Sequence, residues 1–212
     1  MTERDRQAVT APAPAERSAI ANAVIIRPSR DEDVDAMLDI YREHVSRGLD
    51  PALMYDTQAP DPNDIKRRRR NMRKHGLPHL VAEIGGTVVG YAYAVSFRKR
   101  PAYRYTLKHS IYVHPAHLHA GIGRTLLPAL IDACAAAGYR QLIGYIDAAN
   151  APSIGLHESC GFRQVGYLPS IGFKFDRWTD VVMVQRSLGS GNTTPPDVWL
   201  PAAGGNGNDD FQ

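Results

Sequence analysis

The sequence predicts a mixed α/β domain built on one sheet in which most strands run antiparallel. Three observations predict this fold class. The expected elements follow the order β-α-α-β-β-β-α-β-α-β-β, which is too mixed for a doubly wound parallel sheet. Residues 105–126 form an apolar strand pattern that leads through a Gly-x-Gly turn into a helix pattern. A content of 43% hydrophobic and 22% charged residues is typical of a globular protein.

A single folded domain is expected over residues 23–187. Residues 1–22 mix alanine, proline and charged residues without periodicity, which predicts a disordered leader. Residues 188–212 are rich in glycine, proline and asparagine and predict a flexible tail. A chain of 212 residues is long enough for one domain with a sizeable core.

The first strand and the first helix follow each other directly. Residues 24–27 are a short apolar run that predicts a strand. Ser29 and, three residues later, Glu32 form a capping-box pattern. Apolar residues then recur at helical spacing, so a helix is predicted over residues 30–46.

A second helix is predicted to begin at Asp61 and Pro62 and to end at Gly76. Its centre, residues 66–74, carries a dense run of arginine and lysine. We interpret this run as a solvated helix face rather than a nucleic-acid patch, because it is isolated and has no stacking aromatic residues beside it.

A β-hairpin and three further strands complete the sheet. Residues 80–84 and 87–97 predict two strands joined by a tight turn at Gly85 and Gly86. The helix after the central segment is expected to end near Gly138 and to kink at Pro128. A short helix starts at Asn150 and Pro152 and ends at Gly161. The last predicted strands are residues 141–146, 162–167 and 179–186.

Composition argues against several classes of protein. A formal charge of +3 and a pI of about 8.9 are too mildly basic to indicate a nucleic-acid binder. The two cysteines match no zinc spacing, so neither a metal site nor a disulfide framework is expected. No apolar run approaches the roughly 20 residues that span a bilayer, and the first residues lack the apolar core of a signal peptide. We therefore expect a cytoplasmic protein.

Five separated segments carry a resemblance to a known family. The segments are residues 96–104, 109–113, 150–158, 161–162 and 172–182. Together with the element order, they resemble the GNAT superfamily of acetyl-coenzyme A dependent N-acetyltransferases, and within it the phosphinothricin acetyltransferase branch. The resemblance implies a mixed, mostly antiparallel sheet of six to seven strands, splayed between the fourth and fifth, with about four flanking helices. It also implies acetyl-coenzyme A as cosubstrate, a small-molecule amine acceptor of amino-acid type and, since such relatives are commonly dimers, an option for a homodimer.

The resemblance places cofactor contacts around the Gly-x-Gly turn. The family's pyrophosphate loop begins with glutamine or arginine, whereas Leu118 stands at that position here. The glycines remain, so backbone N–H groups can cradle phosphate. A backbone N–H of Tyr112 or Val113 is expected to meet the thioester carbonyl. The expected cofactor-binding residues are Tyr112, Val113, Leu118, His119, Ala120, Gly121, Ile122, Gly123, Arg124, Asn150 and Ser153.

His157 stands at the position where this branch carries a catalytic histidine. An imidazole with an unperturbed pKa near 6.5 can supply or accept a proton at neutral pH. The alternative is a structural histidine, half-buried beside Phe162.

Lys108 stands where relatives carry a glutamate that acts as the base. Strand alternation places it on one face with Thr106, Ser110 and Tyr112. Three interpretations are open: a buried lysine that loses its proton and acts as the base, a lysine that holds an acceptor carboxylate, or the mark of a poor catalyst. The last makes a coenzyme A-binding sensor without turnover the rival function.

The resemblance assigns the acceptor pocket to Tyr55, Arg98, Arg100 and Tyr103. Guanidinium groups pair with carboxylates or phosphinates in a bidentate manner, which suits an amino-acid-like acceptor. On a surface loop the same arginines are compatible with a solvated turn.

Overall fold

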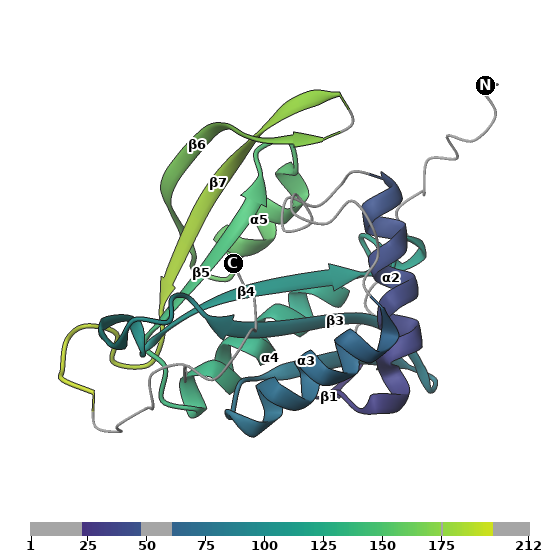
Figure 1. Cartoon of the computed structure of the whole chain (residues 1–212), viewed down its shortest axis with the longest axis horizontal. Coiled ribbons are helices and arrows are strands. Elements are labelled where there is room, and N and C mark those ends of the chain that lie inside the picture. The colour runs from purple at the N-terminus through teal and green to yellow at the C-terminus, as the bar shows by residue number, and fades with distance from the viewer. Residues whose placement is uncertain (1–22, 48–60, 175, 197–212) are drawn as a thin grey trace.

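A computed structural model describes residues 23–47, 61–174 and 176–196, and Figure 1 shows their arrangement. One sheet of seven strands has the order β1-β2-β3-β4-β5-β7-β6. Its strands are β1 (Ile25–Pro28), β2 (His79–Ile84), β3 (Thr87–Ser96), β4 (Thr106–Val113), β5 (Gln141–Asp147), β6 (Arg163–Lys174) and β7 (Arg177–Ser187).

The sheet divides between β4 and β5. These strands are parallel and pair over three residues only, the last pair being Lys108 with Ile143. Beyond that pair the strands diverge, so that Figure 1 shows β4 running to the right and β5 running upward. Every other neighbouring pair is antiparallel. The predicted mixed sheet with a splay between the fourth and fifth strands is therefore confirmed.

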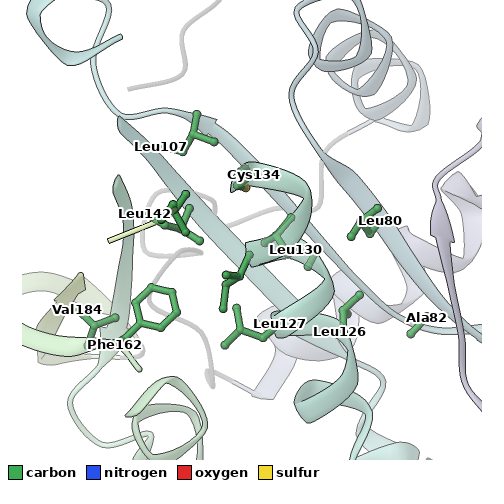
Figure 2. Packing of buried hydrophobic residues seen from close by; sticks show 14 of the residues in the cluster. Leu80, Ala82, Leu107, Leu126, Leu127, Leu130, Cys134, Leu142, Phe162 and Val184 are labelled. Atoms are coloured by element: carbon green, nitrogen blue, oxygen red, sulfur yellow. The ribbon is translucent and has the colours of Figure 1, made fainter. Parts of the chain in front are cut away.

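Helices cover both faces of the sheet. The α-helices are α2 (Val34–Arg47), α3 (Pro62–Lys74), α4 (Ile122–Ala136) and α5 (Ala151–Ser159). Helix α4 lies behind the sheet in Figure 1 and packs its leucines on β2, β4 and β5. Figure 2 shows Leu126, Leu127 and Leu130 of α4 facing this cluster. Apolar residues of α2 pack on the opposite face against Tyr91 and Tyr112.

The hairpin turn at Gly85 and Gly86 is confirmed, because both glycines have positive φ, at 55° and 84°, between β2 and β3. The start of α3 is also confirmed: Asp61 accepts a hydrogen bond of 2.7 Å from the backbone N–H of Asn63, and Pro62 is the first helical residue.

The helix predicted over residues 30–46 begins in the structure with a 3-10 turn at Asp31, and the α-helix itself begins at Val34. Asp33, not Glu32, accepts the hydrogen bond from a capping-position N–H, that of Arg30, at 2.7 Å. The Asp33 carboxylate is held there by Arg27, whose guanidinium donates two bonds of 2.8 Å. Ser29 is buried, and its hydroxyl has no partner among the described residues. A short 3-10 turn, Asp31–Asp33, precedes α2.

The arginine run is not a uniformly solvated face, so that interpretation is wrong for Arg69. This side chain is 3% exposed, donates to the carbonyl of Ser29 at 2.8 Å and pairs with Asp31. Its neighbours Arg67 and Arg70 are exposed, as expected. The position faces the sheet because it lies one turn from the buried Met72.

The last two strands are longer than predicted and form an extended hairpin. Leu188, at the end of β7, is 1% exposed, and its N–H donates to the carbonyl of Arg140 at 2.9 Å. Within the described part of the chain, no helix is long and apolar enough to cross a membrane.

Candidate active site

The loop between β4 and α4 presents unpaired backbone donors. Gly121 precedes the helix in a left-handed conformation, with φ of 88°. The first helical hydrogen bond runs from the N–H of Thr125 to the carbonyl of Gly121, at 3.2 Å. Among the described residues nothing accepts from the N–H groups of Ile122, Gly123 and Arg124. These donors, at the positive end of the helix dipole, form an anion cradle.

The side chains around this cradle divide into buried residues that belong to the core and exposed residues that face solvent. Ala120 and Ile122 are each 1% exposed and belong to the core, whereas His119 and Arg124 are exposed and Leu118 is half-buried. Anchoring by the core fixes the backbone donors, and the exposed basic residues lie beside them.

Gly123 has a packing role as well. A Cβ atom at this position would lie 2.9 Å from Cδ2 of Leu156. The glycine therefore lets α5 approach the first turn of α4. This approach brings the helix that carries His157 next to the cradle.

The inner edge of β4 offers further donors. The N–H of Phe97 bonds to the carbonyl of Thr106, and that of His114 to the carbonyl of Val89. Bonded pairs alternate along an antiparallel ladder, so Tyr112 directs its N–H toward β3, whereas Ile111 and Val113 direct theirs toward the gap beside β5. Of the two donors expected from the sequence, Val113 is the one that faces the gap.

His109 fills the point where β4 and β5 part. Its Nδ1–H donates to the carbonyl of Ile143 at 2.9 Å, next to the last backbone pair. The ring lies over Gly144, where a Cβ would come within 2.9 Å of the His109 Cε1. No role was predicted for His109 from the sequence. The available signal was a polar residue on the otherwise apolar face formed by Leu107, Ile111 and Val113.

His157 is 2% exposed and uses both ring nitrogens inside the protein. Its Nδ1–H donates to the carbonyl of Ser153 at 2.7 Å, one helical turn earlier. Its Nε2 lies 2.9 Å from Nε2 of His109. The ring packs edge-on to Phe162, with centroids 5.1 Å apart. Burial lowers the pKa of both imidazoles.

Asn150 and Ser153 position His157 through the start of α5. The side-chain oxygen of Asn150 accepts from the N–H of Ser153 at 3.1 Å and caps the helix. The carbonyl of Ser153 in turn holds His157. In this structure the two residues expected to contact the cofactor thus also fix the histidine.

The side chain of Lys108 is half-buried, and its ammonium has no hydrogen bond or ion pair among the described residues. Its ladder neighbours are Val95 on β3 and Ile143 on β5. Burial lowers the pKa of the Lys108 ammonium. An unpaired cation in this position either attracts an anion or loses its proton readily.

Three of the four predicted acceptor residues, Arg98, Arg100 and Tyr103, lie in the loop between β3 and β4, near the end of the ladder that holds Lys108. The Arg98 guanidinium carbon lies 5.3 Å from the ring centroid of Phe97 and 5.8 Å from that of Tyr103. Arg100 is exposed. Tyr55 lies outside the described residues. This loop precedes β4, whereas the Gly121 loop follows it, so the two sets of residues lie at opposite ends of the strand.

His44 of α2 is a residue that sequence analysis missed. Its Nε2 lies 2.8 Å from the carbonyl of Val113, and its ring is edge-on to Tyr112 at 5.7 Å. It therefore borders the carboxyl end of β4, where the donors of the gap lie. No local pattern marks it, because its contact spans 69 residues of sequence.

Comparison with known proteins decides the family. Residues 35–162 match the model of the acetyltransferase (GNAT) family. The chain belongs to this family. A phosphinothricin N-acetyltransferase of Alcaligenes faecalis is 44% identical over 82% of this chain and 88% of its own length. An L-methionine sulfoximine/L-methionine sulfone acetyltransferase of Salmonella typhimurium is 37% identical over 77% of this chain and 94% of its own.

A solved GNAT structure has the same architecture. The phosphinothricin acetyltransferase of Sinorhizobium meliloti, in complex with AcCoA, superposes with a TM-score of 0.79 at 37% identity. The match covers 84% of this chain and 95% of the other. The resemblance inferred from the sequence segments is confirmed.

Proposed function

We propose that this GNAT protein transfers an acetyl group from acetyl-coenzyme A to the primary amine of a small amino-acid-like acceptor, of the phosphinothricin or methionine sulfoximine type. The observation that carries the proposal is the anion cradle at Gly121, placed beside the gap between β4 and β5. The names of the relatives from Alcaligenes faecalis and Salmonella typhimurium support the acceptor class.

The unpaired N–H groups fit a pyrophosphate. In the proposal, the loop of residues 118–124 holds it through the unpaired backbone N–H groups of Ile122, Gly123 and Arg124, and the guanidinium of Arg124 adds positive charge. Bound acetyl-coenzyme A supplies the acetyl group as an activated thioester. In the proposal, the N–H of Val113, which is directed into the gap, stabilises the oxyanion that forms on the acetyl carbonyl.

Proton movement is assigned to His157 and Lys108. Direct attack of the amine requires loss of a proton from nitrogen and gain of one by sulfur. His157 moves this proton in the proposal. Lys108 has two open roles, as a base in its neutral form or as the partner of an acceptor carboxylate, together with Arg98, Arg100, Tyr103 and Tyr55.

A sensor that binds acetyl-coenzyme A without turnover is the second candidate. It is favoured by Lys108 in place of the family glutamate and by Leu118 in place of a polar loop residue. Incubation with acetyl-coenzyme A and a panel of amino acids, phosphinothricin and methionine sulfoximine, with thiol release as readout, separates the two. Release with an acceptor supports the enzyme. Binding without release on every acceptor, with no rescue by Lys108→Glu, identifies the sensor.

A homodimer in the cytoplasm completes the proposal. Large apolar side chains of β6 and β7 are 50–65% exposed, and an apolar surface of this kind favours self-association. They are Val165, Tyr167, Ile171, Phe173 and Trp178. Both cysteines, Cys134 and Cys160, are free thiols, which fits a reducing compartment. Sedimentation equilibrium of the wild type and of Trp178→Ser tests the dimer, since a monomer in both refutes it.

A further inference from the structure

The imidazoles of His109 and His157 make three short polar contacts in a row. Nδ1 of His109 lies 2.9 Å from the carbonyl oxygen of Ile143, the two Nε2 atoms lie 2.9 Å apart, and Nδ1 of His157 lies 2.7 Å from the carbonyl oxygen of Ser153. A carbonyl oxygen only accepts, so each Nδ1 carries a hydrogen. The central contact needs a hydrogen as well, because two bare ring nitrogens at this distance would set lone pair against lone pair.

Three contacts therefore need three hydrogens, whereas two neutral imidazoles carry two. We infer that His109 and His157 share one additional proton between their Nε2 atoms and titrate as a single unit, and that His109 is the positioning residue for the proton that His157 moves. The shared proton follows from the geometry alone. Only its use in acetyl transfer rests on the proposed function.

The surroundings of the pair keep this proton weakly held. Phe162 lies 5.2 Å and 5.1 Å from the two rings, and neither ring has a carboxylate partner among the described residues. Burial by itself lowers the pKa of both imidazoles. The bridge itself raises the pKa of the pair, because removal of the shared proton leaves the lone pairs of the two Nε2 atoms facing each other.

Three charged residues lie next to the pair in sequence or in the sheet, and each points away from the bridge or is engaged elsewhere. Lys108 is adjacent in sequence but points to the other face of β4. On α5, Glu158 is exposed to solvent. On β7, Arg186 donates to the carbonyl of Cys160. Titration of the bridge is thus governed by burial and by the two rings themselves.

The location suits a proton relay. His109 reaches Ile143 at the point where β4 and β5 part. In acetyl transfer the carbon–sulfur bond breaks and its electron pair leaves with sulfur, while the amine nitrogen loses one hydrogen as the amide bond forms. A pair that gives its bridging proton to sulfur and takes one from the amine is unchanged after each turnover. A weakly held proton favours the first step.

Nitrogen NMR of histidine-labelled, ligand-free protein tests the shared proton directly. We expect three of the four ring nitrogens of the pair to carry hydrogen at neutral pH, with a scalar coupling across the Nε2–Nε2 bridge. Both rings should lose the bridge at one common pH. Two hydrogens instead of three, or rings that titrate at separate pH values, would overturn the shared proton.

The variant His109→Phe tests the positioning role. It keeps an aromatic ring but removes the acceptor, so the charged form of His157 becomes less stable. The limb of the kcat profile that falls with rising pH should move to lower pH by about one to two units. An unmoved limb would overturn the role of His109. If no acceptor is acetylated while the NMR bridge is present, the proposed function fails and the shared proton stands.

Discussion

Gly144→Ala should disturb the histidine pair at a cost that the structure sets. A Cβ at position 144 would lie 2.9 Å from Cε1 of His109 and 3.0 Å from Cγ2 of Val184. Neither neighbour can move freely, because His109 is bonded to the carbonyl of Ile143 and Val184 is 1% exposed in the core. Overpacking of this kind costs about 1–3 kcal/mol. At about 2–4 °C per kcal/mol for a domain of this size, Tm should fall by about 2–12 °C.

Gly155→Ala is the matched control. Gly155 lies in α5, and a Cβ there meets no atom within 4 Å, so alanine should stabilise the protein by about 0.4–1 kcal/mol. Differential scanning calorimetry of both variants, with thiol release at one fixed pH, measures stability and activity together. We expect Gly144→Ala to lower both Tm and the rate of thiol release, and Gly155→Ala to keep the wild-type rate with a slightly higher Tm. A Gly144→Ala protein with wild-type Tm and rate would show that the ring of His109 is not confined, and the packing argument would fail.

Two further predictions concern the anion cradle and the acid stability of the fold. Gly121→Asp should abolish saturable binding of acetyl-coenzyme A in calorimetric titration, because it adds a negative charge and strains a backbone with φ of 88°. The control is Gly85→Asp in the hairpin turn, where φ is 55°, and this variant should bind acetyl-coenzyme A normally. Burial raises the pKa of Asp33, but hydrogen bonds from Arg27 and from the N–H of Arg30 outweigh it and hold that pKa below its usual value of 3.8. The Asp33 carboxylate therefore stabilises the fold above about pH 4, and this contribution is lost as the pH falls through the lower, folded-state pKa. Asp33→Asn should flatten the loss of unfolding free energy below pH 4, and an unchanged acid limb in urea titrations would contradict the assignment.

Local signals predicted the elements whose chemistry is local. The Gly85-Gly86 turn and the Asp61-Pro62 helix start depend on neighbouring residues, and both are present in the structure. The first helix start was displaced because Arg27 holds Asp33 from a different element. The helical pattern predicted a solvated Arg69 and not a buried one, because its partner Ser29 lies 40 residues away in the sequence. Tertiary contacts of this length leave no mark on a helical pattern.

The candidate site follows the same division. The glycine loop could be located from sequence because glycines and a strand-to-helix transition define it locally. The partnership of His157 with His109 could not, because it joins positions 48 residues apart through a gap in the sheet. The acceptor residues Arg98 and Tyr103 were placed by resemblance, and the ladder register brings their loop near Lys108.

The short β4–β5 ladder gives this sheet two edges in its interior. Ordinary edge strands leave rows of unpaired amides that recruit foreign strands, and proteins protect them with charge, bulges or covering elements. Here the protein's own elements protect these edges. The strands β4 and β5 diverge, so their edges do not pair with each other. His109 and His44 bind the carbonyls of Ile143 and Val113, which are therefore not available to a foreign strand. The protein can thus keep open polar backbone at the centre of its sheet without inviting aggregation there.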